Sequence, residues 1–312
     1  MRIRTAPRAS SPRSVCRTLL LVATTVALGA CHPGNEEAKR LDKSCEAGQA
    51  AACNQLAAKL QKGEYVLRDD ARAAVLFDRA CNGGIAPGCA SLGVVYQRGR
   101  GVRRDSARAL ALLQKGCESG AMDGCARVGM LYRQGAGVPK DIAHAVALFA
   151  QACNGGDTNG CAHLGSLYAS GEGVVLDAAR AAGLLKRACD AEVALGCLGM
   201  GQLHATGAGV ARNDSSAAAL FRSACEGGET EGCFQRAVLL EAGQGTAQNY
   251  ALAADLYRDA CEDAHGESCA RLADLYDKGA GVSQQPERAV TFRKRACGYG
   301  YKEACVKPKA AA

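Results

Sequence analysis

Apolar and small side chains recur at helical spacing through most of this 312-residue chain. In residues 125–134 they fall at i, i+3, i+4 and i+7, which is one face of an amphipathic helix. A second stripe follows in residues 142–153. The two stripes consist of Cys125, Val128, Gly129, Leu131 and Tyr132, and of Ala145, Leu148, Phe149, Ala152 and Cys153. The pattern predicts two successive helices of roughly ten and twelve residues.

The segments around these stripes carry residues that end and begin helices. Gly135 and Gly137, within Gly-Ala-Gly-Val, favour the positive φ of a tight turn. Asp141 stands where the second helix begins, and its carboxylate can accept hydrogen bonds from the first N–H groups. Gly155-Gly156 ends that helix in the manner of a left-handed cap. Each unit is therefore predicted to be a helical hairpin.

The hairpin pattern repeats every 36 residues, and one hairpin cannot bury its apolar stripe without stacking on neighbours. We predict an all-α solenoid over residues 41–305, with seven full repeats, partial terminal units and a tail at residues 306–312. The full repeats begin at Cys53, Cys89, Cys125, Cys161, Cys197, Cys233 and Cys269. Four tyrosines share one slot and are expected to pack between units: Tyr96, Tyr132, Tyr168 and Tyr276. The first repeat departs from the pattern, because Tyr65 replaces its second turn glycine.

Sixteen of the eighteen cysteines form eight Cys-x7-Cys pairs in register with the repeat, which indicates disulfides and an oxidising compartment. The pairs are Cys45/Cys53, Cys81/Cys89, Cys117/Cys125, Cys153/Cys161, Cys189/Cys197, Cys225/Cys233, Cys261/Cys269 and Cys297/Cys305. Pairing within each motif joins the end of one hairpin to the start of the next and leaves no cysteine over. The rival scheme pairs cysteines 28 apart, such as Cys53 with Cys81, and leaves the first and the last cysteine of the array without a partner. Structural zinc fits this spacing poorly, so we expect no metal and no cofactor.

The N-terminus has the features of a secretory signal. Residues 1–17 are basic, and the short apolar stretch 18–30 ends in Leu-Gly-Ala before Cys31. This ending resembles the bacterial lipobox, which implies that Cys31 is lipidated and becomes the mature N-terminus; the alternative is an ordinary secretory signal. His32 rather than Asp follows Cys31, which favours an outer membrane lipoprotein facing the periplasm. Residues 31–40 are then expected to form a polar tether.

The charge of the mature chain is close to neutral. The full chain carries a net charge of +7, but five arginines and no acid lie in residues 1–30. Removal of that segment leaves 33 basic and 31 acidic residues, a net charge of about +2. The composition therefore gives no reason to expect a nucleic-acid partner, and membrane attachment is expected through the N-terminal lipid alone.

The repeat motif A-x-L-G-x-L-Y-x-x-G-x-G-V…D…A…L-F…A-C-x-x-G resembles the Sel1-like repeat, a relative of the tetratricopeptide repeat. The Cys-x7-Cys grid is similar to that of the cysteine-rich Sel1-like proteins known from Helicobacter. The resemblance covers residues 45–305. It implies a right-handed α/α superhelix with disulfides within each pair, and a binding scaffold as the usual role. It also implies a second hypothesis, because some cysteine-rich members are described as penicillin-binding proteins or weak β-lactamases.

Motifs for hydrolytic chemistry are absent from the sequence. Ser-x-x-Lys, Ser-Asp-Asn, Lys-Thr-Gly, G-x-S-x-G and zinc-binding His-Glu-x-x-His do not occur. The five histidines occupy different repeat slots or the N-terminal segment: His32, His144, His163, His204 and His265. No catalytic residue can be assigned, although dispersed residues could still assemble a β-lactam site.

The repeat leaves variable polar residues on the first helix of each hairpin, at its third and tenth positions. Stacked hairpins form an extended concave surface on which such residues select a ligand. We assign Arg98, Arg127, His163 and Arg271 as candidate groove residues. The expected ligand is an envelope protein, an extended peptide or a peptidoglycan fragment. A plain solvent face would have the same composition.

Overall fold

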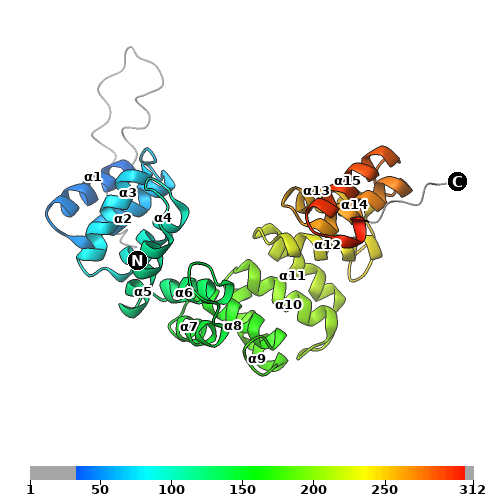
Figure 1. The fold of residues 1–312 in the computed structure, drawn as a ribbon, viewed down its shortest axis with the longest axis horizontal. Helices are drawn as coiled ribbons and strands as arrows, with labels where there is room; N and C mark the ends of the chain where they lie inside the picture. The colour runs from blue at the N-terminus through cyan, green and yellow to red at the C-terminus, as the bar shows by residue number, and fades with distance from the viewer. Residues whose placement is uncertain (1–32, 306–312) are drawn as a thin grey trace, which may run out of the picture. The chain divides into compact units, whose positions relative to one another are not determined.

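The chain folds into helical hairpins (Figure 1). The structure is a computed structural model that describes residues 33–305. Its described part consists of helices and contains no strand. The helices are α1 (Pro33–Glu46), α2 (Ala50–Lys62), α3 (Asp70–Asn82), α4 (Ala86–Arg98), α5 (Ser106–Glu118), α6 (Met122–Gln134), α7 (Ile142–Asn154), α8 (Thr158–Ser170), α9 (Ala178–Asp190), α10 (Ala194–Thr206), α11 (Asp214–Glu226), α12 (Thr230–Ala242), α13 (Tyr250–Glu262), α14 (Gly266–Lys278) and α15 (Pro286–Gly298), followed by the short 3-10 helix η1 (Lys302–Cys305). The predicted all-α repeat fold is confirmed.

The chain divides into two compact units, Met1–Leu112 and Leu113–Ala312, with the boundary inside α5. Unit 1 buries a core of Leu56, Leu60, Phe77, Leu92 and Val95 between α2, α3 and α4. Unit 2 buries one large aromatic side chain in each of three second helices: Phe149, Phe221 and Tyr257 are almost fully buried on α7, α11 and α13, while α9 buries Leu185. Across the described residues, no helix is long and apolar enough to span a bilayer.

The third repeat shows how local sequence sets the hairpin. Helix α6 ends at Gly135, which has φ +69°, and Gly137 in the same turn has φ +79°. The Asp141 carboxylate accepts a hydrogen bond from His144 N at 2.9 Å and caps α7. Both helices have 13 residues and are longer than predicted. Helix α6 begins three residues before Cys125, and α7 extends one residue beyond Cys153.

Disulfides close the junctions between successive hairpins. All eight form between cysteines eight apart, with Cα–Cα distances from 4.4 Å at Cys225–Cys233 to 4.8 Å at Cys297–Cys305. The other pairs are Cys45–Cys53, Cys81–Cys89, Cys117–Cys125, Cys153–Cys161, Cys189–Cys197 and Cys261–Cys269. The predicted disulfide-linked solenoid thus pairs the two cysteines within each Cys-x7-Cys motif. Each bridge lowers the conformational entropy of the unfolded chain, which should stabilise the folded state by about 2–3 kcal/mol.

Glycine and alanine allow the same junctions to close tightly. A Cβ at Gly160 would lie 2.6 Å from the Cβ of Ala152, and one at Gly196 would lie 2.6 Å from that of Ala188. A glycine precedes the second cysteine in five of the eight pairs, and an alanine precedes the first cysteine in six of them. Since Cβ atoms do not approach this closely, any larger residue at the glycine would force the helices apart.

The four tyrosines that share one repeat slot, called the tyrosine row below, have partners that the sequence did not predict. A cationic or imidazole side chain twelve residues later covers each ring. Arg108 lies 4.4 Å from the centre of the Tyr96 ring, and Arg180 lies 4.4 Å from that of Tyr168. His144 packs edge-on against Tyr132, and Arg288 donates a hydrogen bond to the hydroxyl of Tyr276. Each pair joins the two helices of one hairpin, so the tyrosines brace hairpins from within.

One predicted boundary was wrong. Residues 33–40 form the first half of α1 and not a polar tether. Pro33 suits the first helical position and Glu36 the first turn, while Ala38 is buried against the first repeat. The predicted signal segment, Cys31 and the tail from residue 306 lie outside the described residues.

We predict opposite effects for alanine at two helical glycines. Gly196→Ala should destabilise the protein by about 1–3 kcal/mol, because its Cβ meets Ala188 Cβ and Cys189 N. Gly183 on α9 has nothing within 4 Å of a Cβ, so Gly183→Ala should stabilise by about 0.5–1 kcal/mol through helix propensity. Urea unfolding followed by circular dichroism measures both. Equal effects at the two sites would contradict the proposed junction packing.

Disulfide removal should weaken one junction. The double variant Cys153→Ala/Cys161→Ala is expected to lose about 2–3 kcal/mol in urea unfolding under oxidising conditions. With reductant present, parent and variant should differ far less. Thiol titration of the unreduced parent should detect no more than the two cysteines outside the pairs, Cys16 and Cys31.

Candidate functional site

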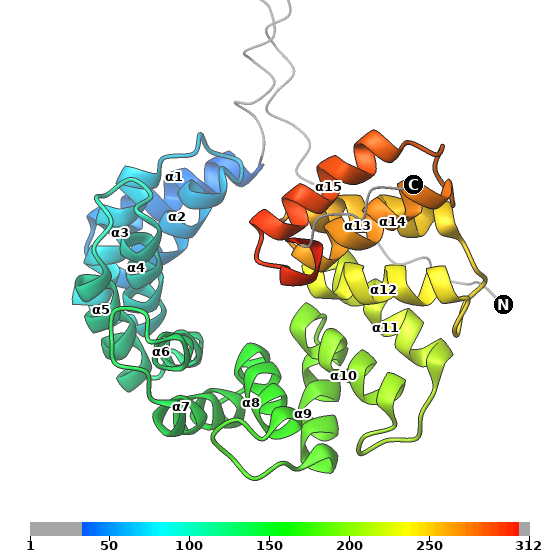
Figure 2. The ribbon, with the colours of Figure 1, turned by 45° about the vertical axis from the view of Figure 1, so that its right-hand side comes forward.

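The first helices of neighbouring repeats line one side of unit 2. Helix α6 contacts α8, and α8 contacts α10, although a second helix separates each pair along the chain. These helices follow one another along one side of the stack (Figure 2). First helices that touch across a repeat mark the more tightly curved face, where stacked hairpins usually bind ligands.

Arg127 and His163 occupy the same slot on α6 and α8, so two of the predicted groove residues lie on neighbouring helices of this face. Among the described residues, neither Nε of Arg127 nor Nδ1 of His163 has a hydrogen-bond partner, although both atoms are buried. The Arg127 guanidinium also forms no ion pair with the described chain. Buried polar atoms are usually satisfied, so this pair is a candidate binding site.

The environment of His163 keeps its ring neutral. The ring stacks on Phe149 with 4.8 Å between centroids. Burial lowers the pKa of His163 to about 4, and the nearby positive charge of Arg133 adds to this effect while Asp157 opposes it. Arg133 itself donates to Glu172 at 2.8 Å, which holds that charge in place. A neutral imidazole can donate at one nitrogen and accept at the other.

The structure separates Arg271 from this pair. Arg271 lines a cavity of about 490 Å³ between α14, α15 and η1. Its guanidinium pairs with Glu267 at 3.5 Å, and the cavity also contains three other carboxylates. Arg293 bridges Asp274 and Asp277 on the same wall. Because acids outnumber arginines here, the cavity does not suit an anionic ligand.

Arg98, the fourth predicted groove residue, lies in unit 1. It is exposed at the end of α4, beside the α4–α5 loop. Arg127 and His163 both lie in unit 2.

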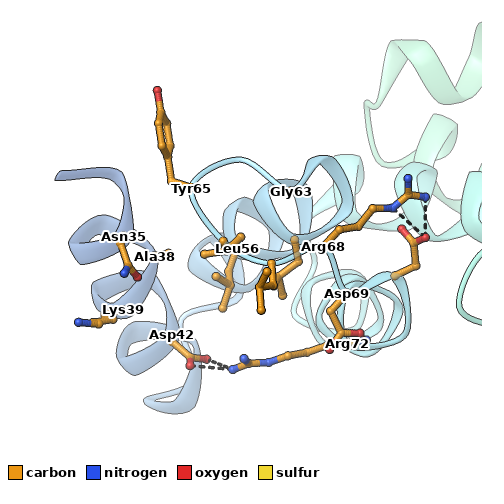
Figure 3. A pocket seen from close by; sticks show the side chains of 14 residues that line it. Asn35, Ala38, Lys39, Asp42, Leu56, Gly63, Tyr65, Arg68, Asp69 and Arg72 are labelled. Carbon is orange, nitrogen blue, oxygen red and sulfur yellow. Dashed lines mark hydrogen bonds and ion pairs between the residues drawn. The ribbon is translucent and has the colours of Figure 1, made fainter. Parts of the chain in front are cut away.

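Unit 1 contains an open groove of about 1190 Å³ between α1, α2 and the α2–α3 loop (Figure 3). Leu56 and Leu60 form its apolar floor, while Lys39 and Asn35 on α1 line its rim. Figure 3 shows the Tyr65 side chain directed away from the floor.

A change in the tyrosine row accounts for this groove. Leu60 stands in the slot of Tyr96, so the first repeat has no ring to occupy that space. Arg72, twelve residues later, has no tyrosine to cover and instead donates to both carboxylate oxygens of Asp42 at 2.7 Å. Leu60 thus contributes an aliphatic side chain to the groove floor where the second repeat has a tyrosine.

One series of side chains in the described residues has the order of a hydrolytic triad, and the sequence reading missed it. His265 Nδ1 lies 2.7 Å from Ser268 Oγ, and His265 Nε2 lies 3.3 Å from Glu231 Oε2. The hydrogen bond from His265 lowers the pKa of Glu231. Ser268 is completely buried, however, and occupies the junction slot where most other repeats have glycine. His265 also caps α14 by accepting from Ser268 N, so the series is a capping arrangement without substrate access.

Metal ligands do not gather in the described part of the chain: it contains no group of three or more His, Cys, Asp or Glu side chains suited to a metal ion.

Comparison with known proteins identifies the family. The Sel1 repeat model matches seven segments, which together cover most of the chain: residues 50–85, 86–120, 123–157, 158–193, 194–229, 230–265 and 266–297. The chain belongs to the Sel1 repeat family. Members of this family are typically protein-interaction modules without enzymatic activity. A search of curated proteins found no match.

Solved structures agree with the fold. The protective antigen c5321 of uropathogenic Escherichia coli, described as having an SLR fold, is 26% identical with a TM-score of 0.63; the match covers 86% of this chain and 57% of that one. A Sel1 repeat protein from Oxalobacter formigenes is 22% identical with a TM-score of 0.61, covering 87% of this chain and 78% of that one. Cysteine rich protein B of Helicobacter pylori is 28% identical over 39% of this chain and 88% of its own, but its TM-score of 0.33 supports no structural conclusion.

We predict that His163 makes stability depend on pH. Its folded pKa of about 4 lies below the ordinary value of 6.5, so the unfolded chain binds the proton more readily. Stability should fall by about 1–2 kcal/mol between pH 7 and pH 5. His163→Gln should remove this part of the loss in urea titrations at the two pH values, whereas the exposed His144→Gln should retain it. A slope unchanged in His163→Gln would contradict the buried, neutral ring.

Proposed function

We propose that the protein is an interaction scaffold of the bacterial cell envelope that binds an extended peptide or protein segment on the first-helix face of unit 2. The observation that carries this proposal is that Arg127 and His163 stand in one slot of two neighbouring repeats, are only partly buried, and each have a side-chain nitrogen without a hydrogen-bond partner among the described residues. Membership of a family of interaction modules supports the same role.

The chemistry of the two side chains suggests what they recognise. Arg127 offers guanidinium donors, and neutral His163 offers one donor and one acceptor. A peptide in extended conformation presents carbonyl and N–H groups, and an acidic side chain would pair with the arginine. Arg127 is only partly buried and forms no ion pair with the described residues, so its guanidinium can donate to a bound carboxylate or carbonyl.

We further propose attachment to the outer membrane through lipid on Cys31, with the repeats in the periplasm. The lipobox-like Leu-Gly-Ala-Cys sequence supports this location. The eight disulfides support an oxidising compartment. Helix α1 begins at Pro33, so little chain would separate the lipid from the first repeat.

No side chain in the described residues favours a β-lactam site over a role as a scaffold. The Ser268 hydroxyl is inaccessible, and the cysteines described are all paired in disulfides. We therefore do not propose a hydrolytic mechanism.

Site-specific photocrosslinking tests the binding face. A photoreactive residue at Gln134, seven residues after Arg127 on the same helix face, should crosslink a discrete partner in envelope-containing cells. Arg127→Gln should reduce that crosslink at least about tenfold, because the charged hydrogen bond is lost.

The matched control carries the photoreactive residue at Ala147, an exposed position on second helix α7 of the same hairpin. It should not capture the partner. Equal crosslinking from Ala147, no discrete product, or insensitivity to Arg127→Gln would each overturn the proposed face.

A further inference from the structure

Two neighbouring loops of unit 1 combine positive charge with exposed apolar side chains. The α4–α5 segment, residues 98–108, contains five arginines and one acid. All five arginines are exposed: Arg98, Arg100, Arg103, Arg104 and Arg108. The near-neutral charge of the mature chain conceals this local concentration.

Most of these arginines are not neutralised within the protein. Arg100, Arg103 and Arg104 form no ion pair with the described residues. The acid of this segment, Asp105, is the N-terminal cap of α5, where it accepts from Arg108 N at 2.9 Å. The positive charge is therefore directed to solvent, where it attracts anionic groups.

The α2–α3 loop, residues 63–69, supplies the apolar part. Leu67 is 92% exposed and Tyr65 is 51% exposed. Tyr65 has φ +60° at the position where later repeats have glycine, a conformation that costs a non-glycine residue energy. The acids beside it are mostly engaged: Asp69 caps α3 and Asp70 pairs with Arg68, which leaves Glu64.

The two loops are held together. A Cβ at Gly101 would lie 2.3 Å from the backbone carbon of Asp70, so the α4–α5 loop packs directly on the start of α3. The Arg68 hydrogen bond is the main cause that lowers the pKa of Asp70, and Arg100 adds a smaller attraction. Leu67, Tyr65, Arg100, Arg103 and Arg104 thus share one edge, called the basic edge below.

We propose that the basic edge docks on an anionic lipid bilayer, with Leu67 and Tyr65 entering the headgroup region and the arginines contacting lipid phosphates. Exposed leucine and tyrosine side chains among unpaired arginines are the combination that a membrane interface binds. An acidic protein surface would pair with the arginines but would leave a leucine that is 92% exposed without an apolar environment. This contact is separate from the partner site of unit 2 and from any lipid on Cys31.

The same loop three repeats later provides a natural comparison. Val175 stands in the slot of Leu67 and is 88% exposed, but the α8–α9 loop contains Glu172 and no arginine. If exposure of an apolar side chain alone caused membrane binding, both loops would bind. The proposal requires the arginines, so only the unit 1 loop should do so.

Vesicle sedimentation tests the proposal with the unlipidated chain from residue 32 onward, which contains every described residue. It should bind phosphatidylcholine vesicles containing about one third phosphatidylglycerol, more weakly at high salt, and barely bind phosphatidylcholine alone. The triple variant Arg100→Gln/Arg103→Gln/Arg104→Gln should lose affinity by on the order of 100-fold. A control with the same charge change on exposed residues of unit 2, Lys186→Gln/Arg212→Gln/Arg222→Gln, should lose much less.

A fluorescent reporter locates the contact. The chain has no tryptophan, so Leu67→Trp and Val175→Trp each create a single reporter in equivalent loops. With anionic vesicles the emission should shift to the blue for Leu67→Trp and remain unchanged for Val175→Trp.

Three results would overturn the proposal: no binding to anionic vesicles, equal losses in the two triple variants, or equal spectral responses of the two reporters. Binding of polyglutamate but not of vesicles, abolished by the triple arginine variant, would assign the basic edge to an acidic polymer instead. None of these outcomes bears on crosslinking at Gln134, so the two proposals fail or stand separately.

Discussion

The close approach of two helix ends beside each disulfide is the contact on which the whole stack depends. The last turn of a second helix usually carries Ala-Cys, and the first turn of the next helix usually carries Gly-Cys. At Gly160 and Ala152 there is no space for one additional methyl group. This proximity brings the sulfur atoms within bonding distance, and the bond in turn keeps the small residues in contact. A thin stack without a deep core is thus restrained twice at every junction.

The period of 36 residues made most of this fold predictable, because seven copies specify each slot repeatedly. The order of helices and turns followed from it, although the helices are longer than predicted. The period could not show which side chains meet across a hairpin, so the partners of the tyrosines were missed. A signal was present: arginine or histidine stands twelve residues after each of the four tyrosines. The helical start of α1 was missed because a polar segment before the first repeat has no second copy for comparison.

At the candidate site, residues in equivalent positions of different repeats have different neighbours, which the repeat pattern alone does not predict. Arg127, His163 and Arg271 share one slot, yet their surroundings differ. Glu267 stands one helical turn before Arg271 and pairs with it, whereas no described acid pairs with Arg127. For Ser268 the neighbouring side chains suggest chemistry, but its position in the repeat excludes it. Its side chain completes a triad-like series, but its slot belongs to the junction, where close packing excludes solvent and therefore substrate. In a repeat protein the framework decides which positions can carry chemistry, and the remaining slots carry recognition.

The first repeat lacks part of this packing, because no full repeat precedes it. In later repeats the second turn glycine abuts the residue 31 positions earlier, as Gly209 does with Ala178 and Gly281 with Tyr250. For Tyr65 the same spacing leads to a glycine in the first turn of α1, where the helix has only begun. A side chain can therefore occupy position 65. The terminal repeat can therefore place a tyrosine at position 65, where every later repeat has glycine.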